Sequence, residues 1–146
     1  MAYCLTADIT TEFKDIEFTT TTTVKAAEVG DFIDQASFTI DSFISSRYSV
    51  PVTAGAGAVL VLKMICIWLV KARVLSILSV KTPQDKTKQD PDGPSLYKQA
   101  MDLMKIIKNG QLPLVGATLV SSDDGMSSFL MNEELTHDFR VGENDW

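Results

Sequence analysis

Apolar residues recur at three- and four-residue intervals along two stretches of the chain, which is the spacing of one face of an α-helix. In residues 24–48 that face consists of Val29, Ile33, Ala36, Ile40, Phe43 and Ile44. The helix should end before Pro51, which disfavours helical geometry in the preceding residue. A second amphipathic helix is predicted from Ser95 to Gly110, with an apolar face of Leu96, Ala100, Leu103, Met104 and Ile107.

The region before residue 24 predicts a short helix and an extended connection. A helix over residues 6–13 would have Thr6 as its N-cap and Asp8 in its first turn, where the helix dipole favours a negative charge. Five threonines follow at residues 19–23, and their β-branched side chains disfavour helix. We expect this run to be extended and to end in the N-cap of the next helix. A phosphorylation or glycosylation tract is the less favoured interpretation.

Residues 58–80 are apolar almost without interruption, which raises the alternative of a membrane-spanning helix. Lys63, Lys71 and Arg73 oppose it, because each central cation costs about 2.5–3.5 kcal/mol on insertion scales while each aliphatic residue returns about 0.3–0.6. We therefore favour a buried helix. A helix that is apolar on nearly all sides exceeds what three short neighbours can cover, so part of it should contact another subunit. The predicted subunit interface is Leu62, Ile65, Trp68 and Leu69.

Two segments rich in glycine or proline are expected to be loops. Residues 53–58 superficially resemble a dinucleotide-binding glycine loop, but no strand pattern precedes them, so a loop or a helix start is favoured. Residues 81–94 contain three prolines among polar residues and predict an exposed loop.

The negative charge is confined to the end of the chain. Residues 1–113 contain equal numbers of acidic and basic residues, whereas residues 114–146 contain seven acidic residues and one basic residue. This shift predicts a helical body, 1–113, followed by an acidic C-terminal arm, 114–146. The arm is expected to be extended or to form a short β-hairpin between 115–120 and 126–131, around Asp124-Gly125. The predicted fold class is therefore all-α, a small bundle of about four helices with a C-terminal arm.

Composition narrows the functional classes further. The 146 residues are enough for one domain, and a net charge of −6 argues against nucleic acid as the main partner. Cys4 and Cys66 lie far apart in the sequence and are expected to be reduced, unreactive thiols. The single histidine, His137, has no neighbours with metal-ligand spacing. We predict no catalytic, metal or cofactor site, and therefore no enzyme.

Several short motifs follow one another along the chain. They are the start Met-Ala-Tyr-Cys-Leu-Thr-Ala-Asp-Ile, Ile40-Asp41-Ser42-Phe43-Ile44 followed by Ser46-Arg47-Tyr48-Ser49-Val50-Pro51, Tyr97-Lys98-Gln99-Ala100 with Ile107-Lys108-Asn109-Gly110, and Asp138-Phe139-Arg140 before a final Trp146. Their order resembles the Mu-like bacteriophage head-tail connector, or neck adaptor, family. These motifs extend over nearly the whole chain. The apolar third helix and the threonine run depart from the family pattern.

The resemblance implies a virion structural protein located in the neck, and in the host cytoplasm before assembly. It would form a homo-oligomeric ring of twelve copies beneath the portal protein and receive a tail-side neck or terminator protein, with viral DNA only passing through the lumen. The C-terminal arm would dock on the portal through Phe129, Leu130, Phe139, Arg140 and Trp146. Two alternatives are a small membrane-associated phage protein, which would need residues 58–80 to enter lipid, and a soluble helical regulatory or binding protein.

Overall fold

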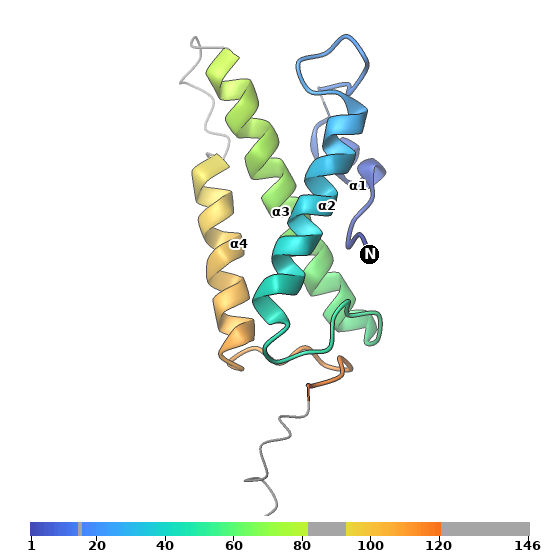
Figure 1. Ribbon diagram of the computed structural model, residues 1–146. Helices are drawn as coiled ribbons and strands as arrows, with labels where there is room; N and C mark the ends of the chain where they lie inside the picture. Colours follow the sequence, from blue (N-terminus) through green and yellow to red (C-terminus); the bar gives the residue numbers. More distant parts are fainter. Residues whose placement is uncertain (15, 82–92, 121–146) are drawn as a thin grey trace, which may run out of the picture.

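Four helices follow one another in the computed structural model: α1 (Thr6–Glu12), α2 (Ala26–Ile44), α3 (Ala56–Lys81) and α4 (Gly93–Lys108) (Figure 1). The structure describes residues 1–14, 16–81 and 93–120, and the side chains of 79–81 are not among those described. Within these ranges there is no sheet, and one antiparallel β-bridge joins Tyr48 to Leu119. The predicted all-α class and the four helices are confirmed.

The central helix is α3, which packs against all three others. Figure 1 shows α2, α3 and α4 forming the body of the bundle, with the short α1 beside α2 and α3. The predicted apolar faces of α2 and α4 point into the core, where Ile40 and Met104 are fully buried. Because α3 has neighbours on several sides, it buries residues around much of its circumference: Ala58, Leu62, Ile65, Cys66, Leu69, Val70, Ala72 and Val74.

The first turns of α1 and α2 use acidic side chains as caps, and the predicted threonine caps are wrong. Leu5 is the N-cap residue of α1, and its backbone N–H donates to the Asp8 carboxylate at 2.9 Å. Lys25 is the N-cap residue of α2, and its N–H donates to the Glu28 carboxylate at 2.8 Å. A carboxylate in the first turn accepts a hydrogen bond from a free N–H and interacts favourably with the helix dipole. It can therefore cap a helix whose N-cap residue has no hydroxyl group.

The threonine run forms a loop stabilised by its own hydroxyls. The Thr22 hydroxyl donates to the carbonyls of Thr19 and Val24, at 3.0 and 2.7 Å, and accepts from the Thr19 N–H at 3.0 Å. Side-chain bonds to nearby backbone groups of this kind compete with helix formation. The run therefore ends before α2 begins at Ala26.

The residues that disfavour helix predicted the end of α4 more closely than the end of α2. α2 ends at Ile44, four residues earlier than expected, because Tyr48 pairs with Leu119 outside the helix. α4 ends at Lys108, and Gly110 follows with a positive φ of 76°, the conformation that glycine adopts readily after a helix.

Residues 114–120, expected to begin the C-terminal arm, lie against the helical body. Leu114 is buried in the core, and the segment pairs with the residues that follow α2. The predicted hairpin strand 126–131 and the five predicted arm residues lie outside the described residues: Phe129, Leu130, Phe139, Arg140 and Trp146.

Candidate functional site

Two segments distant in sequence, residues 45–55 and 109–120, close the lower end of the bundle in Figure 1, and we call them together the foot. The Ser49 N–H donates to the Thr118 carbonyl at 2.8 Å, and the Val120 N–H donates to the Arg47 carbonyl at 2.9 Å. The Tyr48 hydroxyl accepts a hydrogen bond from the Leu114 N–H at 3.1 Å. The foot therefore fixes residues 114–120 against the segment that follows α2.

Two glycines let the segments of the foot touch backbone to backbone. Gly55 and Gly116 have φ values of +83° and +86°, which L side chains rarely adopt. A Cβ on Gly116 would lie 2.7 Å from the Gly55 Cα, and a Cβ on Gly55 would overlap the Val115 carbonyl oxygen. The glycine-rich stretch before α3 is thus a close-packed loop, as expected in preference to a nucleotide-binding loop.

Arg47 joins the ends of α2 and α4 within the foot. Its guanidinium covers Gly110 so closely that a Cβ there would overlap it, and it lies 5.9 Å from the centroid of the Tyr48 ring. Its Nε is buried and has no hydrogen-bond partner among the described residues. Arg47 therefore contributes to this junction mainly by packing its planar guanidinium group against Gly110 and near the Tyr48 ring.

The N-terminal segment is anchored by Tyr3. Its hydroxyl donates to Asp41 on α2 at 2.5 Å and accepts from the Val52 N–H at 3.0 Å, while its own N–H donates to the Ser37 hydroxyl at 3.1 Å. Burial and the bond to Asp41 hold the pKa of Tyr3 well above its usual value, so the hydroxyl stays protonated and continues to donate.

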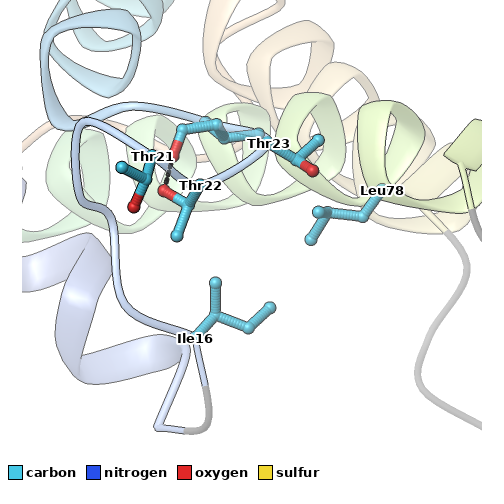
Figure 2. A pocket seen from close by; sticks show the side chains of 6 residues that line it. Ile16, Thr21, Thr22, Thr23 and Leu78 are labelled. Atoms are coloured by element: carbon cyan, nitrogen blue, oxygen red, sulfur yellow. Dashed lines mark hydrogen bonds between the residues drawn. The ribbon is translucent and has the colours of Figure 1, made fainter.

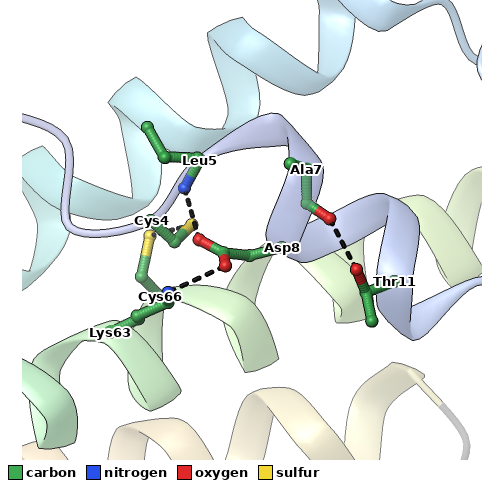
Figure 3. A network of polar contacts seen from close by, with 7 residues as sticks. All are labelled: Cys4, Leu5, Ala7, Asp8, Thr11, Lys63 and Cys66. Atoms are coloured by element: carbon green, nitrogen blue, oxygen red, sulfur yellow. Dashed lines mark hydrogen bonds and ion pairs between the residues drawn. The ribbon is translucent and has the colours of Figure 1, made fainter.

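Figure 3 shows the contact between the start of α1 and α3. The Lys63 ammonium lies 2.8 Å from an Asp8 carboxylate oxygen, and the same carboxylate accepts the Leu5 N–H. The hydrogen bond from Lys63 and then that from Leu5 lower the pKa of Asp8. One turn further along α1, Glu12 pairs with Lys71 of α3 at 3.3 Å.

Cys4 and Cys66 also meet at this contact, with their sulfur atoms 3.1 Å apart (Figure 3). Both are free thiols and both are buried. The Ser37 hydroxyl lies 3.8 Å from the Cys66 sulfur. The sequence indicated reduced thiols but gave no sign that the two sulfurs are neighbours.

Three cations of α3, Lys63, Lys71 and Arg73, lie against α1, the residue that follows it, or α2. Lys63 pairs with Asp8, Lys71 lies 5.7 Å from the Phe13 ring centroid, and Arg73 lies 5.8 Å from that of Phe32. Across the described ranges, no helix combines the length and apolar character that crossing a bilayer requires. These cations instead connect α3 to its neighbours in the bundle.

A pocket of about 340 Å³ lies between the threonine run and the end of α3 (Figure 2). Its lining residues are Ile16, Thr21, Thr22, Thr23, Val24 and Leu78. These described lining side chains are aliphatic or hydroxylic, and none of them is an acid, a base or a charged group. Among the described residues, no three histidine, cysteine or acidic side chains gather closely enough to hold a metal ion.

The structure corrects three of the four residues predicted for the subunit interface. Leu62 and Ile65 are completely inaccessible to solvent and Leu69 is 8% exposed, because α2 and α4 cover this side of α3. Their side chains belong to the core of one chain and have no surface to offer a second copy. Trp68 is only partly buried and stays a predicted contact residue.

Other apolar side chains among the described residues are exposed. On α3 they are Leu60 and Met64, one turn apart and one turn before Trp68, so the three share one side of the helix. In the foot they are Val115, Leu119 and Val120, and elsewhere they are Met1, Leu5, Phe38, Tyr97 and Ile106. Sequence reasoning missed the α3 residues because a helix apolar on every side gives no signal of which side is free.

A protein-family model described as Bacteriophage Mu, Gp36 matches residues 3–128 of the chain. The match includes all four helices and the foot. Comparison with curated proteins and with solved structures gives no match.

Proposed function

The chain belongs to the Bacteriophage Mu Gp36 family and is therefore a phage protein, and from this we propose that it is a structural component of the virion, a head-tail connector in the neck. In this role it forms a ring between the portal and the tail. A tail-side neck or terminator protein binds the opposite face, and viral DNA only passes through the lumen. The protein performs no reaction and needs no cofactor.

The observation that carries this proposal is the number of large apolar side chains that a single chain leaves uncovered. Val115 and Phe38 are about three-quarters exposed, at 75% and 74%, and Leu60 is 64% exposed. Leu60 and Phe38 belong to long helices, so their positions are set by the bundle. Exposed apolar side chains that share one side of a helix, as Leu60 and Met64 do on α3, mark a protein contact surface.

We assign the contact between copies to the side of α3 that carries Leu60, Met64 and Trp68. A ring requires two different surfaces on each copy, because a contact that repeats by rotation joins one face to another. The partially buried Trp68 supplies the aromatic group that interfaces favour. This assignment replaces the buried Leu62, Ile65 and Leu69 in the predicted interface.

We assign the portal contact to the foot and to the arm that follows it. Leu119 and Val120 are exposed and are the last residues of the foot. The arm beyond Val120 includes the aromatic residues Phe129, Phe139 and Trp146, with Leu130 and Arg140. Aromatic and arginine side chains in an acidic, polar segment are suited to anchoring it in pockets of a partner.

Electron microscopy of purified virions tests the location. The proposal expects density matching the four-helix body, repeated as a ring at the junction of head and tail. Particles in which this chain is absent from the neck would reject the proposal.

A pair of variants tests the contact between copies. Leu60→Ser combined with Met64→Ser should reduce the number of copies bound per isolated portal ring at least about tenfold, because two apolar contacts are lost from every subunit junction. Tyr97→Ser on α4 is the control, since it also removes an exposed apolar group and should leave binding unchanged. Equal binding by both variants would contradict the assignment of α3.

A further inference from the structure

The sulfur atoms of Cys4 and Cys66 lie at hydrogen-bonding distance although the residues are 62 positions apart. Their separation of 3.1 Å exceeds the S–S bond length of a disulfide, about 2.05 Å, by roughly 1 Å. The chain has no other cysteine. Any cross-link within one chain must therefore join these two residues.

Contacts on both sides of Cys4 hold it at this position. Before it, Tyr3 is bound to Ser37 and Asp41 on α2. After it, the Leu5 N–H is bound to Asp8, which pairs with Lys63 on α3, one turn before Cys66. The two thiols are thus brought together by independent contacts to two helices, and their approach does not depend on the sulfur contact itself.

We propose that Cys4 and Cys66 form a reversible redox site, at which a disulfide joins the N-terminal segment covalently to α3. The inference rests on the geometry of the pair and is independent of the connector role. It adds a covalent modification site to a chain whose two cysteines were expected to be inert.

The reaction balances with a small-molecule disulfide, such as oxidised glutathione, as the oxidant. The Cys66 thiolate attacks one sulfur of the oxidant and expels the other as a thiolate, which leaves a mixed disulfide on Cys66. The Cys4 thiolate then attacks the Cys66 sulfur and expels the second small thiolate. Two protons leave the protein thiols, and the two electrons reduce the oxidant to two thiols.

The surroundings distinguish the two thiols in this sequence. The hydrogen bond from Cys4, assisted by the Ser37 hydroxyl, lowers the pKa of Cys66, so Cys66 is the thiol that ionises first. The same hydrogen bond, together with burial, raises the pKa of Cys4. Both sulfurs are buried, so the oxidant reaches Cys66 when the segment before α1 separates from α3.

The test measures how strongly the folded chain favours the cross-link. The full chain is equilibrated with mixtures of reduced and oxidised glutathione, in buffer and in urea, and the cross-linked fraction is quantified by alkylation and peptide mass spectrometry. The effective concentration of one thiol toward the other should be at least about tenfold higher in the folded chain than in urea. A value equal to or below the urea value would overturn the proposal, as would glutathione adducts or cross-linked dimers as the only products.

Moving one thiol by a single residue supplies the matched control. In the double variant Cys4→Ser, Leu5→Cys, the thiol takes the place of an exposed side chain while the distance along the chain hardly changes. Its effective concentration in buffer should fall to the value in urea. If that variant does not fold, the comparison of the unmodified chain in buffer and in urea still decides the proposal. An unchanged effective concentration in a folded double variant would overturn it.

Discussion

Glycines in this chain occupy two very different environments. Gly55 and Gly116 have positive φ values and touch through their backbones, so neither has room for a side chain. Gly30 lies inside α2 and has no atom within 4 Å of the position that a Cβ would take. The same residue type is therefore required in the foot and unfavourable in the helix.

Replacing Gly116 by alanine should destabilise the protein by about 2–4 kcal/mol, since the new methyl group meets the Gly55 backbone and the backbone conformation disfavours an L residue. The free energy of unfolding, measured by urea denaturation, checks this value.

The matched variant Gly30→Ala should raise the free energy of unfolding by about 0.5–1 kcal/mol, because alanine has the higher helix propensity and meets no neighbour. Equal effects of the two substitutions would contradict the close backbone contact in the foot.

Single residues were the hardest part of the structure to predict from the sequence. The apolar spacing identified Ile40 and Met104 as core residues, and both are fully buried. Nothing local to Cys4, Cys66 or Gly116 indicates a partner, because each contact joins segments brought together only by the folded bundle.

At the scale of helices, periodicity predicted α2 and α4 well and could not orient α3. The first two are amphipathic, so their polar residues mark the solvent side. α3 is apolar on nearly all sides, and packing alone decides that Leu62 is buried while Leu60, two residues earlier, is exposed. Three of the four residues predicted for the subunit interface are therefore buried in the core of a single chain.

α1 has only seven residues, so its position depends on contacts with α2 and α3. The Asp8–Lys63 pair is one of these contacts, and it lowers the pKa of Asp8 in the folded state. A carboxylate whose pKa is lowered by folding stabilises the protein above its unfolded pKa, about 3.9, and loses that contribution as the pH falls through the folded value.

The variant Asp8→Asn should therefore lower the free energy of unfolding by up to about 1 kcal/mol at pH 7, the range of exposed ion pairs. The difference from the unmodified protein should shrink as the pH falls below about 4, where Asp8 of the unfolded chain takes up a proton, and should vanish once the pH is below the lowered pKa of the folded state. Urea denaturation between pH 7 and pH 3 measures both quantities.

Adding Lys63→Met isolates the ion pair in a double-mutant cycle. With methionine at position 63, Asp8→Asn should cost less at pH 7 than it does beside lysine. An Asp8→Asn effect that is the same beside lysine and methionine would show that the pair itself contributes nothing.

At the scale of the whole molecule, the foot makes residues 114–120 part of the body. Leu114 is buried, and backbone bonds tie Thr118 and Val120 to the residues after α2. The charge pattern predicts a boundary near residue 114, but charge reports solvation, and it cannot show which neutral residues of the following segment pack on the body.

Two truncated chains test whether the folded body ends at Pro113, as the charge pattern predicts, or includes the foot up to Val120. A chain ending at Pro113 should be less stable than one ending at Val120 by at least about 2 kcal/mol, because it loses the buried Leu114 side chain and the hydrogen bonds of the foot. Thermal and urea denaturation of both chains provide the measurement. Equal stability of the two chains would mean that the foot contributes nothing to the fold.

The β-bridge between Tyr48 and Leu119 also determines how tension would travel through the molecule. A pull on the chain beyond Val120 reaches Arg47 and Ser49 first, through the hydrogen bonds that span the foot. The force is then transmitted to α2. α4 is nearer to Val120 in sequence, but no force acts on it until those hydrogen bonds break. Mechanical strain from the carboxyl side would thus be delivered to the hydrogen bonds between the two segments of the foot before it could unwind α4.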